Sequence, residues 1–191
     1  MFDRKAFLVK ERVGFLKLSG TYDIFDPATG AQIGIAQEQV GPLMHVLRFL
    51  INKRLLPTVV EVREREGGPV LLSLRRSPVS HVSVRNQSGR EVGRLKAKLF
   101  ALRAGFRVFD ASERQIAEVN GDWKGWNFRL VSAEGTELGK VTKQWAGLGK
   151  ELFTSADNYV IALDDRLPAA PEAAALLLAA GLAIDTVYNE N

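Results

Sequence analysis

Three cations recur at every second position near the middle of the chain: Arg94, Lys96 and Lys98. Alternate residues of a β-strand share a face, so these three side chains are expected to line one face while the apolar residues between them line the other. Such a row attracts the phosphates of anionic lipid headgroups or of nucleic acids. A solvated outer surface without a ligand is the alternative. Further arginines extend the row if neighbouring hairpins pack in sequence order: Arg75, Arg76, Arg85, Arg90, Arg103 and Arg107.

The charge distribution points to the same region. Residues 63–107 contain 11 Lys and Arg against 3 Asp and Glu, whereas residues 108–191 contain 7 against 13. Charge asymmetry of this kind speaks to partners and not to fold. The sequence therefore predicts a basic middle segment that meets an anionic partner.

Other groups that could do chemistry are few. The chain has no cysteine and two histidines, His45 and His81, which lie in different predicted elements. Phosphate-binding glycine loops, dinucleotide fingerprints and nucleophile-elbow motifs are absent from the sequence. We therefore expect a protein that is not an enzyme, and no resident cofactor.

The elements that position the cations are predicted to be β-hairpins. A weak repeat of apolar alternation, polar turn, apolar residue, small residue and apolar residue begins at Tyr22, Val82, Phe106 and Phe128. Its small residues are Gly34, Gly93, Ala117 and Gly139. Glycine suits the short turns of three copies, and because the third copy has Glu113 at that place, its turn is expected to differ. About a dozen strands over residues 5–165 predict a closed antiparallel barrel.

The chain ends in a segment that is apolar on every helical face, Ala173–Ile184. At about 1.5 Å per residue it reaches roughly 18 Å, well short of the roughly 30 Å hydrocarbon core of a bilayer. A helix over about 170–188 is therefore expected to fill the lumen of the barrel. The residues expected to form this plug are Leu176, Leu177, Leu178, Leu182 and Ile184.

One interruption, at about 42–55, changes from strand to helical periodicity and predicts an amphipathic helix that covers one barrel mouth or lies on a membrane. Residues 1–191 are expected to form a single domain. The charged N-terminal segment predicts no secretory signal or membrane anchor, and hence a cytoplasmic protein.

Three separated segments resemble the phospholipid scramblase and LURP-one-related family, which has the Tubby C-terminal-like fold. They are FDRKAFLVKERVGFLKLSGTYDIFDPATGAQIG, WAGLGKELFTSADNYVIAL and the closing apolar helix with IDTVYNEN. The resemblance implies a mainly β fold, in which a twelve-stranded barrel surrounds a buried C-terminal helix. It also implies association with phosphoinositides, with calcium-dependent lipid scrambling or, in some branches, with roles that are not known.

The same resemblance implies a calcium segment at Ser155–Arg166, of which Asp157 and Asn158 match the family pattern. The leading acid, the glycine and the closing acid of that pattern are replaced here by Ser155, Val160 and Arg166. An ordinary polar turn at Asp157 and Asn158 is therefore the alternative to a calcium site.

Two functions follow as hypotheses. The first is peripheral binding of anionic phospholipid at the inner face of the membrane through the basic face, with possible lipid scrambling. The second is an interaction module for protein or nucleic acid with no lipid activity. A monomer is favoured.

Trp126 is expected to pack in the core, since it continues the strand that contains Phe128.

Overall fold

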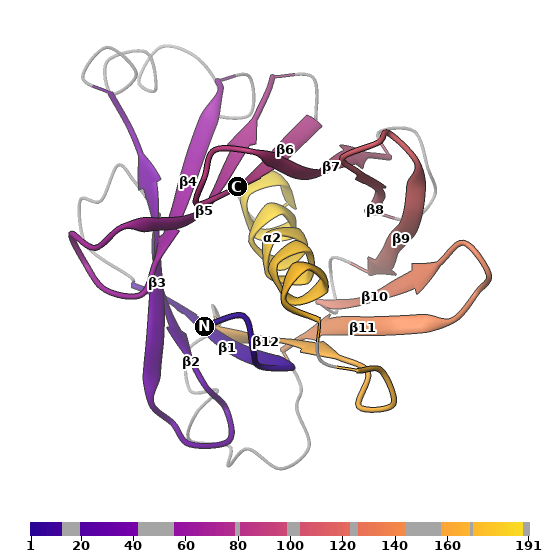
Figure 1. The fold of residues 1–191 in the computed structure, drawn as a ribbon, viewed down its shortest axis with the longest axis horizontal. Coiled ribbons are helices and arrows are strands. Elements are labelled where there is room, and N and C mark those ends of the chain that lie inside the picture. Colours follow the sequence, from indigo (N-terminus) through magenta and orange to yellow (C-terminus); the bar gives the residue numbers. More distant parts are fainter. Residues whose placement is uncertain are drawn as a thin grey trace.

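The computed structural model of the chain describes residues 1–12, 20–41, 56–78, 81–98, 104–122, 126–143, 158–168 and 170–188. Its strands form a closed barrel in which each strand pairs antiparallel with its neighbours in sequence, and β1 pairs with β12 (Figure 1). The predicted barrel is therefore confirmed. The strands are β1 (Ala6–Glu11), β2 (Thr21–Phe25), β3 (Gln32–Gln39), β4 (Thr58–Arg63), β5 (Val70–Arg76), β6 (His81–Asn86), β7 (Glu91–Ala97), β8 (Ala104–Asp110), β9 (Gln115–Asp122), β10 (Asn127–Ser132), β11 (Glu137–Thr142) and β12 (Asn158–Leu163).

Helix α2 (Pro171–Tyr188) runs through the middle of the ring of strands (Figure 1). Leu177, Leu178, Leu182 and Ile184 are at most 1% exposed and belong to one apolar core that includes residues of the surrounding strands. Leu176 is partly buried against the same core. The predicted plug is confirmed, and the helix begins and ends within two residues of the predicted bounds.

The repeat in the sequence corresponds to a repeated irregularity of the barrel. In four hairpins the register shifts by one residue directly after the pair that contains the repeat's small residue. These pairs are Ile24 with Gly34, Val84 with Gly93, Val108 with Ala117 and Leu130 with Gly139. A bulge bends the strand and increases its twist, so the repeat marks the positions at which the sheet curves toward closure.

The small residues also leave room for α2. A Cβ atom at Gly93 would lie 2.7 Å from Cδ2 of Leu176, and one at Gly139 would lie 2.9 Å from Cδ2 of Leu177. Both distances are shorter than packed carbon atoms tolerate. Two successive leucines of the helix therefore rest where two strands carry no side chain.

The seam of the barrel pairs the first and last strands, with Phe7 opposite Ile161 and Leu8 opposite Val160. Tyr159, Ile161 and Leu163 face the lumen core, as their alternation predicts. On the other face, Val160 and Ala162 form a second apolar cluster with Leu8. Because both faces of β12 are buried, its sequence is an uninterrupted apolar run from Tyr159 to Leu163.

The predicted helical insert at about 42–55 lies outside the described residues. No helix among the residues described is long and apolar enough to cross a membrane. Trp126 is 7% exposed, and its ring centroid lies 5.0 Å from that of Tyr159 and 6.2 Å from that of Phe128, so the expectation of a packed Trp126 is confirmed.

Candidate functional site

Strands β5 to β8 are neighbours in sequence order, which is the condition under which the separate cations share one surface. On β7, Leu95 is fully buried while Arg94 and Lys96 lie on the opposite face. Across the sheet, Arg94 pairs with Ser83 of β6, and Lys96 pairs with Arg107 of β8. We call the outward-facing cations of this region, with Arg90 in the turn between β6 and β7, the basic face. Its members are Arg75, Arg85, Arg90, Arg94, Lys96, Lys98 and Arg107.

Arg76 does not belong to this face, so its expected exposure is wrong. It is 5% exposed, and its Nη1 donates to the carbonyl oxygen of Thr186 at 2.8 Å. Its Nη2 donates to Oγ1 of Thr58 at 3.1 Å. Arg76 has the same strand parity as the buried Leu72 and Leu74, and this signal in the sequence places it inward.

Two other predicted site residues, Arg103 and Asp157, lie outside the described residues. Asn158 is the first residue of β12, pairs with Lys10 of β1 and is 6% exposed. It therefore lies in the seam strand, and its expected place in a turn is wrong. Within the described part of the chain, no three His, Cys, Asp or Glu side chains gather as a metal site would require. Calcium binding by Asp157 stays a prediction.

Four of the seven cations of the basic face lie close to carboxylates that the sequence did not predict as their neighbours. Arg94 forms ion pairs with Glu91, at 2.5 Å, and with Glu113. Glu113 also lies 3.7 Å from Lys96. These contacts join the strand β7 to the turn between β8 and β9, and they offset much of the field that Arg94 and Lys96 would otherwise present to an anionic partner.

A third carboxylate, that of Glu118 on β9, lies beside Lys98 and Arg107. Nζ of Lys98 lies 2.5 Å from Oε2 of Glu118 and donates to Oδ1 of Asn120 at 2.8 Å. The hydrogen bond from Lys98 lowers the pKa of Glu118 below its ordinary value. The Lys98 side chain is 14% exposed, and Nε of Arg107 is 3.9 Å from Oε1 of Glu118. The ammonium group of Lys98 is therefore mostly covered by its contacts with Glu118 and Asn120, and little of it is exposed to solvent.

Three arginines of the basic face differ from its other four cations in their neighbours. Arg75, Arg85 and Arg90 are exposed, and no carboxylate of the described residues lies within ion-pair distance of any of them. We call them the open arginines. Arg75 lies on β5, Arg85 lies on β6 and Arg90 lies in the turn after β6, so the three occupy adjacent elements of the barrel wall. An exposed guanidinium without a carboxylate partner is available for bidentate binding of a phosphate.

The turn that contains Glu113 corrects the expectation that it differs from the others. Glu113 has a φ of 60°, close to the values of Gly89 and Gly135. Its N–H donates to the carbonyl oxygen of Asp110, as Gly89 and Gly135 donate to Asn86 and Ser132. A left-handed backbone costs a side-chain-bearing residue about 1–2 kcal/mol. The ion pairs of Glu113 with Arg94 and Lys96 offset part of the free energy that this backbone conformation costs.

This arrangement predicts that two substitutions of Glu113 differ in stability. Glu113→Gln keeps the strained backbone and loses both ion pairs, and we expect it to lower the free energy of unfolding by up to about 1 kcal/mol. Glu113→Gly loses the same ion pairs but relieves the strain, and is expected to be about 1 kcal/mol more stable than Glu113→Gln. Urea unfolding followed by circular dichroism measures both. A glycine variant less stable than the glutamine variant would contradict this account of the turn.

Comparison of the chain with curated proteins and with solved structures finds no match in either set. A family model described as Scramblase matches residues 59–191, a segment that includes strands β5 to β12, helix α2 and the whole basic face. The match covers more than half of the chain, and the chain therefore belongs to the Scramblase family.

Proposed function

We propose that the protein binds anionic phospholipid at a membrane surface, and that the open arginines Arg75, Arg85 and Arg90 are its leading contacts. The observation that carries this proposal is the division of the basic face. Arg94, Lys96, Lys98 and Arg107 share three carboxylates, while the open arginines are exposed and have none within the described residues. Membership of the Scramblase family supports a phospholipid as the anionic partner.

The open arginines lie on the outer wall of the barrel, where they can contact the surface of a membrane without entering it. Cations near an anionic bilayer each contribute about 1 kcal/mol, and that attraction falls off within a Debye length. Binding is therefore expected to weaken steeply as ionic strength rises. Because α2 runs through the barrel and packs against the strands around it, we propose that any lipid scrambling by this protein runs along its outside surface. We also propose that the chain belongs to the LURP-one-related branch with the Tubby C-terminal-like fold.

The test is co-sedimentation with vesicles of phosphatidylcholine, with and without phosphatidylserine. We expect binding that requires phosphatidylserine, and a triple variant Arg75→Gln, Arg85→Gln, Arg90→Gln that binds about a hundredfold more weakly. The triple variant Arg94→Gln, Lys96→Gln, Lys98→Gln should lose less, since those cations already have partners. A calcium arm tests the prediction for Asp157.

A matched control removes three cations from the other side of the barrel: Arg129→Gln, Lys140→Gln and Arg166→Gln, on β10, on β11 and after β12. It changes the net charge by the same amount and should leave most of the vesicle binding intact. Equal losses in the two charge-matched variants would mean that net charge alone drives binding. No binding to any vesicle, together with a salt-sensitive shift of RNA or DNA, would favour a nucleic-acid module instead.

A further inference from the structure

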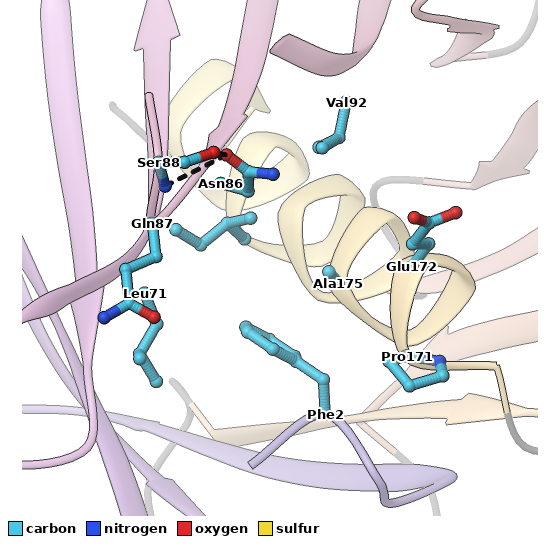
Figure 2. A pocket seen from close by; sticks show the side chains of 10 residues that line it. Phe2, Leu71, Asn86, Gln87, Ser88, Val92, Pro171, Glu172 and Ala175 are labelled. Carbon is cyan, nitrogen blue, oxygen red and sulfur yellow. Dashed lines mark hydrogen bonds between the residues drawn. The ribbon is translucent and has the colours of Figure 1, made fainter. Parts of the chain in front are cut away.

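A cavity of about 450 Å³ opens at the barrel end where the tight turns lie, between the first turns of α2 and the wall made by β5 to β7 (Figure 2). Its walls are mainly apolar and include Phe2, Leu71, Val92 and Ala175. The volume is in the range of roughly 300–1,000 Å³ typical of small-molecule sites. This space is separate from the outward-facing basic face, because Leu72 and Ala175 in its lining are buried.

The cavity exists because one side of α2 carries small residues. Leu176 closes the gap to β7 by packing over Gly93, whereas its neighbour Ala175 reaches no farther than its Cβ. Figure 2 shows the Phe2 and Leu71 side chains on the other side of the space left by Ala175. The apolar walls are thus held apart by the helix backbone, and an apolar ligand could enter without displacing a core side chain.

Polar groups stand at two edges of this cavity. Oδ1 of Asn86 accepts hydrogen bonds from N of Ser88 at 3.1 Å, Oγ of Ser88 at 2.7 Å and N of Arg90 at 3.1 Å. These three donors fix the orientation of the amide, so that Nδ2 of Asn86 points away from the turn and toward α2 (Figure 2). At the first turn of α2, the exposed Glu172 supplies a carboxylate.

We propose that this cavity binds the acyl chain of a single-chain lipid with an uncharged head, such as a monoacylglycerol. The chain occupies the apolar walls, Nδ2 of Asn86 donates to the ester carbonyl oxygen, and a head hydroxyl donates to Glu172. An anionic head is disfavoured there by the Glu172 carboxylate. The cavity and the basic face therefore prefer heads of different charge, and this inference goes beyond the proposed function without resting on it.

The test is calorimetric titration of the whole chain with octanoyl, decanoyl and dodecanoyl glycerol below their micellar concentrations. Each added pair of methylenes should tighten binding roughly tenfold. Dodecanoate, whose head is anionic, should bind at least tenfold more weakly than dodecanoyl glycerol, and Glu172→Gln should reduce that difference. Affinity that does not change with chain length, or a preference for the anionic head, would overturn the proposal.

Ala175→Leu places a side chain in the cavity and should weaken binding of dodecanoyl glycerol at least tenfold. Ala173→Leu, an exposed position on the same helical turn, is the matched control and should bind as the parent does. Leu71→Phe fills the cavity from the opposite wall and replaces Ala175→Leu if that variant does not fold. Equal binding by the filled variants and the control would overturn the proposal.

Vesicle binding separates this inference from the proposed function. Ala175→Leu should still sediment with phosphatidylserine vesicles, and the triple variant of the open arginines should still bind dodecanoyl glycerol. A parent protein that binds dodecanoyl glycerol but no vesicle would contradict the proposed function alone. A parent protein that binds phosphatidylserine vesicles but not dodecanoyl glycerol would contradict the cavity proposal alone.

Discussion

Gly139→Val should lower the free energy of unfolding by about 3 kcal/mol, because it overpacks the contact between the barrel wall and α2. A Cβ atom at Gly139 would lie 2.5 Å from the carbonyl oxygen of Ala162 and 2.9 Å from Cδ2 of Leu177. The carbonyl belongs to the β11–β12 ladder, where Gly139 pairs with Leu163, so it cannot move without disturbing the sheet. Urea unfolding followed by circular dichroism measures the loss.

Gly135→Ala, in the turn of the same hairpin, is the control for Gly139. Its φ is 86°, and nothing lies within 4 Å of the Cβ position, so the backbone strain acts there without a packing clash. We expect it to lower the free energy of unfolding by about 1–2 kcal/mol. If Gly139→Val were no more destabilising than this control, α2 could not be packed closely against β11.

Arg76→Met should lower the free energy of unfolding by about 3 kcal/mol. The guanidinium of Arg76 donates to the carbonyl oxygen of Thr186 in the last turn of α2 and to Oγ1 of Thr58. The last carbonyls of a helix have no partner within the helix, and leaving one of them buried without a donor is costly. Methionine keeps most of the volume and removes the donors. Hydrogen exchange should accelerate in the last turn of α2 before the rest of the helix.

Arg75→Met is the matched control, since Arg75 precedes Arg76 on the same strand and faces outward. It should leave the free energy of unfolding within about 0.5 kcal/mol of the parent. It should, however, weaken binding to anionic vesicles, which Arg76→Met should not do under conditions where that variant is folded. The reverse pattern would mean that Arg76 and not Arg75 is the surface cation.

The barrel and its plug could be predicted because each has a strong local signal. A helix that is apolar on all sides must be buried, and Leu178 and Ile184 are fully buried. The repeated hairpins placed the small residues correctly because Gly93 and Gly139 sit beside the helix in the structure as well as in the pattern. Glu113 was missed because its strain is compensated by residues of another hairpin.

The candidate site was predictable in part. Alternation along β7 placed Arg94 and Lys96 on the outer face, but the same alternation along β5 assigns Arg76 to the inner face, a signal outweighed by its charge. The partners of the cations could not be predicted, because Glu113 and Glu118 meet them through the register of the β8–β9 hairpin with β7. Alternation along one strand shows which residues share a face, but it does not show which residues of the next strand lie opposite them.

The seam between β1 and β12 has a consequence for the order of folding. It joins Ala6 to Ala162 and Lys10 to Asn158, so closure must wait until most of the chain has been synthesised. Contacts this distant in sequence make folding slow. Because α2 follows β12 in the chain, the apolar strand residues that pack against the helix stay uncovered until α2 has been made. During synthesis the growing sheet therefore exposes two unpaired edges and a bare apolar face, a state that favours aggregation and chaperone binding.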